Sequence, residues 1–239
     1  MYRYKTGIPL IDREFGGLRA ATNLLILAPP LAYAERLAYT IACPKAGEWT
    51  ITISTDDRAS DIIRAFRGLG AGKDQVGIID AITKCSVPTL RDTPKAKFVT
   101  SPVDLTSMGI KFSRMAEDMW KEGVMAEPPG PMPPPLRLCV NSVSTLLMYS
   151  RLEMTFRFLH VITNRVKKLE GIGIYVLNSE SFDERTVSAI KQLMSMVLEV
   201  KADGEGQGTE RSFRIVGIRG RTTPWIRYFY DDGTLTIEG

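Results

Sequence analysis

Polar residues that could take part in chemistry stand directly after short apolar runs. Asp56 and Asp57 follow the run Thr50–Ser54, and Asn141 follows the run Leu136–Val140. Polar side chains at the ends of neighbouring strands can converge around one ligand. An acidic pair after a strand is also common at the N-terminal cap of a helix. The sequence therefore leaves a ligand-binding and a capping interpretation open.

A third carboxylate, Glu35, lies within the stretch LLILAPPLAYAERLAY, Leu24–Tyr39. An apolar run, two prolines and a helical pattern follow one another there, which is the outline of a strand, turn and helix that hold a phosphate. The glycines and the lysine of such a turn are missing. Because a carboxylate in the first helical turn satisfies the positive end of the helix dipole, Glu35 either fills the anion site from within or is an ordinary surface glutamate.

Short apolar runs alternate along the chain with longer segments of helical periodicity, which favours a parallel sheet with helices on both faces. The apolar runs predict buried strands at Leu24–Leu27, Thr50–Ser54, Val76–Ile79, Leu136–Val140 and Gly173–Leu177. Apolar residues three and four apart predict helices at Ala32–Ile41, Ala59–Leu69, Leu105–Lys121, Glu153–Lys168 and Glu184–Met194.

The pattern changes near the C-terminus, where strands follow one another closely. They are predicted at Met196–Val200, Arg211–Ile218, Trp225–Tyr230 and Thr234–Ile237, with glycine-containing turns such as Asp231–Gly233 between them. The C-terminal edge of the sheet is therefore expected to be antiparallel. The stretch EPPGPMPPP, 127–135, predicts a stiff extended loop, with a proline-rich ligand for a partner as the alternative. We expect residues 1–239 to form a single domain.

The composition is that of a folded protein with a mild basic excess. Hydrophobic residues make up 44% of the chain, which suffices for an ordinary core, and the net charge of +4 permits an acidic partner such as nucleic acid. Cys43, Cys85 and Cys139 lie far apart and form no CxxC pair, so neither a disulfide framework nor a zinc site is expected. No apolar run reaches the roughly 18 residues of a membrane span. We expect a cytoplasmic protein that binds no membrane and no metal.

Segments spread over nearly the full chain resemble the RecA/KaiC-like ATPase family of archaea. They are TGIPLIDREFGGL at the N-terminus, STDD at Ser54–Asp57, VNSVSTLL at Val140–Leu147 and RIVGIRG at Arg214–Gly220, in that order and spacing. Ser101–Ile110 and Leu146–Val166 are similar to segments of an uncharacterised archaeal branch of the family. The resemblance implies a RecA-like α/β fold.

The same resemblance implies a nucleotide site, because the family motif GxxxxGK[ST] wraps phosphates in backbone N–H groups and a lysine while its hydroxyl binds magnesium. Laid over that motif, Ala28, Leu31 and Tyr33 stand at the glycines, Ala34 at the lysine and Glu35 at the hydroxyl residue. The resemblance therefore implies a degenerate site.

The expected loss of nucleotide affinity is large. Losing the lysine costs roughly 1.5–3 kcal/mol, and side chains in left-handed backbone positions cost about 1–2 kcal/mol per residue. We therefore expect the loop to adopt another shape and affinity to fall by roughly three to four decades. Asn141 replaces the family's magnesium-organising aspartate, so no cofactor is expected. Asp56 and Asp57 match the acidic pair that in the family polarises the attacking water, so the resemblance implies that this element is kept. With no phosphate to attack, capping is the favoured role of Asp56 and Asp57.

The late RIVGIRG element corresponds to a basic pair that, in the family, reaches across a subunit interface to the neighbour's nucleotide. Gly217 lacks the first cation, whereas Arg219 keeps the second and Arg221 adds another. An arginine supplied in trans does not require its owner to bind a nucleotide. The alternative is that Arg219 and Arg221 are solvated residues that discourage sheet-to-sheet aggregation.

These expectations favour a pseudo-ATPase that acts as a regulatory or scaffolding protein, not an enzyme. Its partner would be a copy of itself or an active relative. Two alternatives stay open. One is a nucleic-acid-binding relative of recombinases that has lost its dependence on ATP, which would use the late arginines. The other is a sensor or enzyme that uses the remodelled pocket, with Glu35, Asp56, Asp57 and Asn141 around another ligand.

Overall fold

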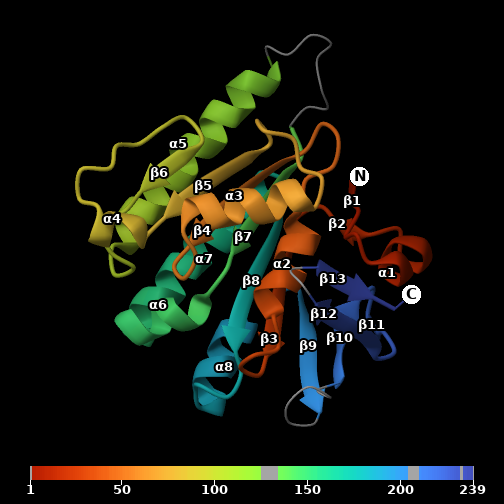
Figure 1. The fold of residues 1–239 in the computed structure, drawn as a ribbon. Coiled ribbons are helices and arrows are strands. Elements are labelled where there is room, and N and C mark those ends of the chain that lie inside the picture. Colours follow the sequence, from red (N-terminus) through yellow and green to blue (C-terminus); the bar gives the residue numbers. More distant parts are fainter. Residues whose placement is uncertain (1, 125–133, 204–209, 232–233, 239) are drawn as a thin grey trace.

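The computed structural model describes residues 2–124, 134–203, 210–231 and 234–238, and their main element is one large sheet (Figure 1). The proline-rich stretch 127–135 and the turn Asp231–Gly233 lie mostly outside the described residues. In spatial order the strands are β13 (Thr234–Ile237), β12 (Ile226–Asp231), β10 (Glu210–Ile218), β9 (Met196–Asp203), β3 (Thr22–Ala28), β8 (Ile172–Asn178), β7 (Leu136–Val140), β4 (Trp49–Ser54), β5 (Val76–Asp80) and β6 (Ala96–Phe98), and β11 (Arg221–Thr222) pairs with β10.

The strand directions confirm the predicted fold class. Strands β9, β3, β8, β7, β4, β5 and β6 are parallel, and β10, β12 and β13 continue the sheet with antiparallel pairs. β9 belongs to both patterns, because it pairs in parallel with β3 and antiparallel with β10. The parallel strands read as continuous apolar runs because helices cover both of their faces.

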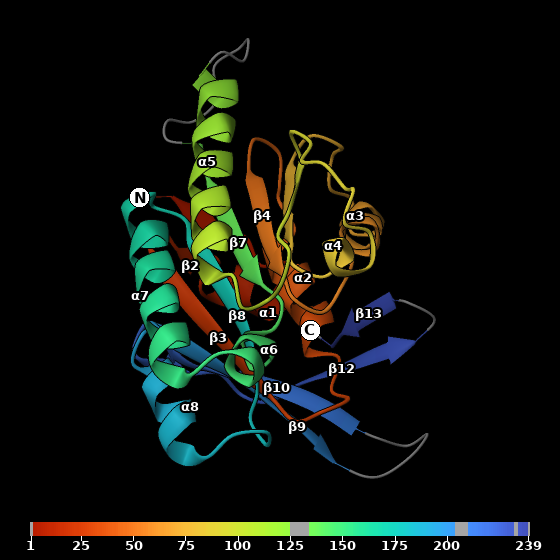
Figure 2. The same ribbon diagram turned by 90° about the vertical axis from the view of Figure 1, so that its left-hand side faces the viewer.

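Helices pack on both sides of the sheet, as Figures 1 and 2 show. On one side Leu37 and Phe66 are fully buried, and on the other side Phe112 and Leu159 are. The first side carries α2 (Ala34–Ala42) and α3 (Ala59–Gly68), and the second carries α5 (Leu105–Val124), α7 (Leu152–Lys168) and α8 (Glu184–Lys191). The periodicity does not predict several short elements: β1 (Arg3–Tyr4), α1 (Pro9–Glu14), β2 (Leu18–Arg19), α4 (Thr83–Ser86), β6, α6 (Val143–Tyr149) and β11.

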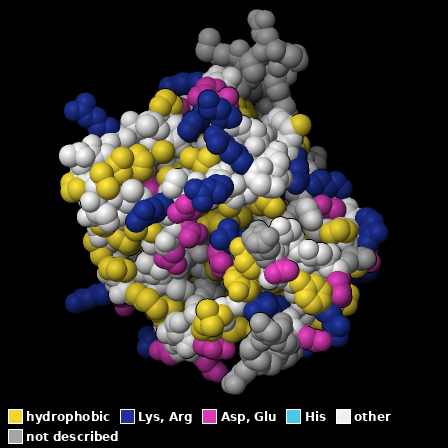
Figure 3. Space-filling view, in the orientation of Figure 1, with side chains coloured by type: hydrophobic (Ala, Val, Ile, Leu, Met, Phe, Trp, Pro, Cys, Tyr) yellow, Lys and Arg dark blue, Asp and Glu magenta, His cyan; other side chains and the backbone are white. Residues whose placement is uncertain are grey.

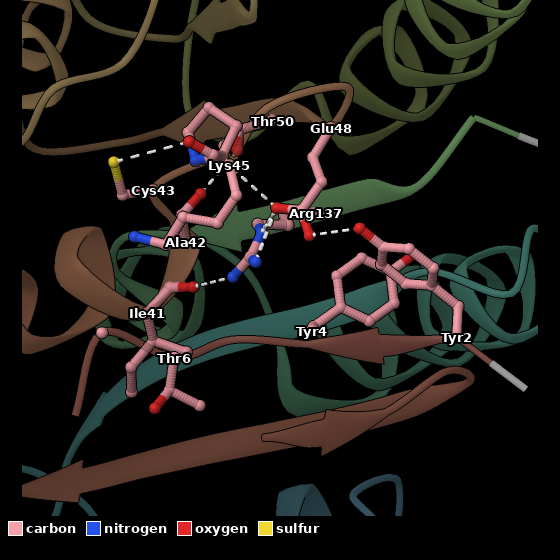
Figure 4. A network of polar contacts seen from close by, with 12 residues as sticks. Tyr2, Tyr4, Thr6, Ile41, Ala42, Cys43, Lys45, Glu48, Thr50 and Arg137 are labelled. Atoms are coloured by element: carbon pink, nitrogen blue, oxygen red, sulfur yellow. Dashed lines mark hydrogen bonds and ion pairs between the residues drawn. The ribbon is translucent and has the colours of Figure 1, made fainter. Parts of the chain in front are cut away.

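A buried ion pair fastens the N-terminal strand to the middle of the sheet (Figure 4). The Arg137 side chain is fully buried, and its Nε and Nη2 atoms lie 2.7 and 2.6 Å from Glu48 Oε2. Arg137 Nη1 donates to the carbonyl of Ile41 at 2.6 Å, and the hydroxyl of Tyr2 donates to Glu48 Oε1 at 2.8 Å. The Tyr4 ring lies under the guanidinium, 5.3 Å from its carbon. Nε and Nη1 of the guanidinium are therefore hydrogen-bonded, while Nη2 is compensated by the ion pair and not by a hydrogen bond.

Candidate functional site

A cavity of 460 Å³ opens at the carboxyl ends of β3, β7 and β8. Parallel strands bring their carboxyl ends to one edge of a sheet, which is where open α/β sheets bind ligands. The lining includes residues singled out from the sequence: Ala28, Leu31, Tyr33, Ala34, Glu35, Asp56, Asp57 and Asn141. The structure thus brings both parts of the predicted degenerate site together.

The loop between β3 and α2 keeps left-handed backbone at two of the positions aligned with glycines. Leu31 has φ of 60° and Tyr33 has φ of 53°. The expectation that side chains would force the backbone out of this conformation is therefore wrong at these two positions. Left-handed backbone costs about 1–2 kcal/mol per non-glycine residue, so contacts elsewhere must hold the loop.

Those contacts come from the end of the chain. The Tyr33 ring stands 4.3 Å from the Tyr230 ring, and the guanidinium carbon of Arg211 lies 4.8 Å from the Tyr33 centroid. The hydroxyl of Tyr228 donates to the carbonyl of Ala32 at 2.5 Å. We call Tyr33, Arg211, Tyr228 and Tyr230 the loop clamp. Sequence reasoning missed the last three, since nothing in a local pattern pairs residues nearly 200 positions apart.

Leu31→Gly is expected to raise the free energy of unfolding by up to about 1 kcal/mol. Glycine removes the left-handed strain, and little packing is lost because Leu31 is 87% exposed. Met148→Gly in α6 is the matched control, since Met148 is also exposed but helical. There glycine should lower stability by about 1 kcal/mol. Urea unfolding measures both changes, and a loss of stability in Leu31→Gly contradicts the assignment of strain.

The first turn of α2 presents an alanine and a glutamate to the cavity. Ala34 is buried and offers no cation. Burial raises the pKa of Glu35, and the nearby Asp57 and Asp56 raise it further, while its own backbone N–H and the Arg36 guanidinium oppose the shift. Glu35 lies in the first turn of α2, where a carboxylate interacts favourably with the helix dipole, and its side chain is 38% exposed. The self-filled anion site and the ordinary surface glutamate therefore both remain predictions.

Both polar atoms of the Asn141 amide group are hydrogen-bonded inside the protein, and both N–H donors are used. Its Oδ1 accepts from the backbone N–H of Thr55 at 3.0 Å, and its Nδ2 donates to Ser54 Oγ at 3.0 Å and to the Tyr39 hydroxyl at 3.2 Å. Asn141 is 3% exposed. An amide nitrogen that donates twice cannot be exchanged for a carboxylate without loss of both donors.

Asp56 and Asp57 do not cap α3, so the favoured capping interpretation is wrong. The N-terminal cap of α3 is Arg58, which makes no side-chain cap, and Asp80 accepts from the backbone N–H of Ala59 instead, at 2.8 Å. Asp57 Oδ2 accepts from the Tyr39 hydroxyl at 2.7 Å, and Asp56 accepts from Thr145 Oγ1. Both carboxylates therefore line the cavity and connect β4 to α2 and α6.

Arg219 and Arg221 lie away from this cavity. Because β10 runs antiparallel to β9, its C-terminal end is at the opposite edge of the sheet. Arg219 Nη2 donates to the carbonyl of Phe15 at 2.6 Å, while Arg221 is exposed in β11. Both residues are therefore too far from this chain's own cavity to contact a ligand there. Arg219 is also not fully solvated, because it donates to Phe15.

Two negative findings apply to the part of the chain that the structure describes. Within it, no group of three or more His, Cys, Asp or Glu side chains has the arrangement of a metal site. None of its helices combines the length and the apolar character needed to cross a membrane.

The sheet order, the helical layers and the position of the cavity define a protein with the RecA/KaiC-like fold. The chain belongs to the family of unknown function DUF7504, whose model matches residues 21–200. No curated protein matches it.

Two solved structures of archaeal proteins are similar over the whole chain. Uncharacterized protein PH0321 from Pyrococcus horikoshii, in complex with an unknown peptide, has a TM-score of 0.72 and 18% identity, covering 98% of this chain and 99% of that one. KaiC-like protein PH0186 from Pyrococcus horikoshii OT3 has a TM-score of 0.68 and 14% identity, covering 100% of this chain and 99% of that one. Identities this low establish the fold alone.

Proposed function

We propose that this chain is a RecA-like protein without ATPase activity that acts as a regulatory or scaffolding protein through contacts with other proteins. The observation that carries the proposal is the enclosed amide of Asn141. At the strand end where the family places its metal-organising aspartate, both donors of this side chain are used and its oxygen already accepts from the Thr55 N–H. In place of a carboxylate, this position offers magnesium only a neutral oxygen that already has a hydrogen-bond partner.

The other side chains of the cavity do not fit magnesium–ATP either. Ala34 gives no charge-assisted hydrogen bond to a phosphate, and Glu35, Asp56 and Asp57 surround the same space with carboxylates. Like charges repel the triphosphate. The left-handed backbone of the loop remains, but the lysine position holds Ala34 and the hydroxyl position holds Glu35. Arg36 also lines the cavity, where its Nε lies 3.9 Å from Glu35 Oε1.

Contacts with proteins are supported by two surfaces at opposite edges of the sheet. One is the loop 29–36, where Leu31 is 87% exposed, and the other carries Arg219 and Arg221. The similar protein PH0321 was solved with an unknown peptide, which is consistent with a protein ligand. In Figure 3, positive and negative side chains are interspersed over the visible face, without the single-sign field that nucleic acid favours. A copy of this chain or an active relative is the proposed partner.

Calorimetric titration with ATP and magnesium tests the loss of nucleotide binding. The native chain should show no binding tighter than about 1 mM. The variant Tyr33→Gly/Ala34→Lys/Glu35→Thr, which rebuilds the family motif, should gain affinity, because it restores the lysine and removes a carboxylate. Tyr33→Gly alone is the control and should bind no better than the native chain. Magnesium-dependent binding of ATP by the native chain in the micromolar range would overturn the proposal.

A further inference from the structure

An apolar groove of 580 Å³ runs between α5 and α7, on the face of the sheet that these helices cover. The two helices lie side by side in front of the sheet in Figure 2. They are parallel, since Gly109 of α5 faces Phe158 of α7 and, farther along, Glu117 faces Arg165. The wall from Met154 to Arg165 extends over about 17 Å at 1.5 Å per residue, the length of three helical turns.

Large apolar side chains are exposed along both walls of the groove. Ile110 is 47% exposed on α5, and on α7 Met154 is 54% and Val161 63% exposed. Phe158 and Ile162, which form the floor between them, are buried. Isolated exposed apolar residues are ordinary, but a contiguous set around a groove indicates an interaction site.

A glycine gives the groove its depth. Gly109 lies in the second turn of α5, and a Cβ atom built there would have Phe158 Cε2 as its nearest neighbour, at 3.9 Å. Glycine in a helix interior costs about 1 kcal/mol relative to alanine. No backbone strain explains its presence, because Gly109 has no positive φ. The open space above it can receive a side chain of a ligand.

The rim of the groove is basic. Arg114, Arg157 and Arg165 border it, and Arg165 is paired with Glu117, with 3.1 Å between Nη2 and Oε1. Among the described residues, no ion pair or hydrogen bond is found for Arg114 or Arg157. Exposed cations beside an apolar strip complement carboxylates placed beside the apolar strip of a ligand.

We propose that this groove binds an amphipathic helix of a partner protein, with large apolar residues on one face and Asp or Glu on its flanks. Three helical turns match the groove in length, apolar anchors at positions i, i+3, i+4 and i+7 match its floor, and acidic flanks match Arg114 and Arg157. The inference rests on the proposed action through protein contacts and specifies the class of partner and the surface that binds it.

A selection from a displayed library of 18-residue helical peptides tests the proposal. The native chain is the target, and Val161→Glu, which places a carboxylate on the exposed wall, is used for counter-selection. Selected peptides should be amphipathic with an excess of Asp and Glu. By fluorescence anisotropy, the best peptide should bind at least about 10-fold more weakly to Val161→Glu and to Arg157→Glu. Val87→Glu is the matched control, since Val87 is 43% exposed outside the groove, and it should bind as the native chain does.

Three outcomes would overturn the inference. In the first, no selected peptide distinguishes the native chain from Val161→Glu. In the second, the selected peptides are neutral or basic. In the third, light scattering shows a native dimer that Val161→Glu dissociates, which would make the groove a contact between copies. Circular dichroism and urea unfolding of each variant exclude misfolding as the cause. The ATP titration does not involve the groove, so failure of that proposal and failure of this one are separate results.

Discussion

Glu48→Ala is expected to lower the free energy of unfolding by about 3–5 kcal/mol, since removing one partner leaves an uncompensated buried charge on Arg137. Arg137 has no access to solvent at its side chain, and Glu48 supplies the carboxylate beside two of its nitrogens. The same substitution removes acceptors from the Tyr2 hydroxyl and from the backbone N–H of Lys45. The N-terminal strand should therefore loosen together with the core.

Urea unfolding measures this loss, and two variants serve as controls. Glu122→Ala removes the exposed pair with Lys95, whose atoms are 2.7 Å apart, and should cost less than about 1 kcal/mol. Glu48→Leu/Arg137→Met removes both buried charges and should cost less than the sum of the single losses. If Glu48→Ala costs no more than Glu122→Ala, the ion pair does not hold the N-terminal strand.

Asn141→Asp is expected to lower stability at pH 8 by about 3–5 kcal/mol, although it restores the family's residue. One oxygen of the new carboxylate can still accept from the Thr55 N–H. The other oxygen faces the Tyr39 and Ser54 hydroxyls, which already donate their protons to other acceptors. Tyr39 donates to Asp57, and Ser54 donates to the Asp57 carbonyl. Burial raises the pKa of Tyr39, so its hydroxyl stays protonated and bound to Asp57.

The penalty of Asn141→Asp should depend on pH. Burial and the neighbouring Asp57 carboxylate favour the neutral form of the new carboxyl group, so its folded pKa lies above the unfolded value of about 3.9. Stability is then least affected below that value and is lost as the pH rises through the folded pKa. Urea unfolding of both proteins at pH 4.5 and pH 8 should show the larger difference at pH 8. An equal loss of unfolding free energy at pH 4.5 and pH 8 would contradict this prediction. It would mean that hydrogen-bond donors stabilise the ionised carboxylate of the variant in the folded protein.

The layered fold follows from the sequence because its determinants are local. The strand Leu136–Val140 is predicted with the bounds that the structure shows, and the Leu105 helix differs only at its end. Apolar periodicity reports burial directly, so elements that bury a face are found. The α6 helix is missed because its seven residues are too short for a periodic pattern, and Ser142, which caps it through the N–H of Thr145, is the signal that was available.

The candidate site could be located from the sequence but its contacts could not. The positions of Ala34 and Asn141 follow from the resemblance to the family motif, which fixes where a loop and a strand end meet. Capping by Asp57 was the wrong interpretation because Asp80, on the next strand, reaches the N-terminus of α3 first. The left-handed backbone at Leu31 and Tyr33 was missed because the residues that contact this loop, Arg211, Tyr228 and Tyr230, are distant in sequence.

The loop clamp has a consequence for engineering and for the divergence of this family. Tyr33 and Ala32 are held by contacts with Arg211, Tyr228 and Tyr230. The loop and the last strands are therefore expected to change together in evolution. A graft that transfers only residues 28–36 from a nucleotide-binding relative would remove Tyr33. Arg211 and Tyr230 would then lose the ring that they contact. Chimeras are expected to succeed when both segments are exchanged together, and natural substitutions in one should be accompanied by substitutions in the other.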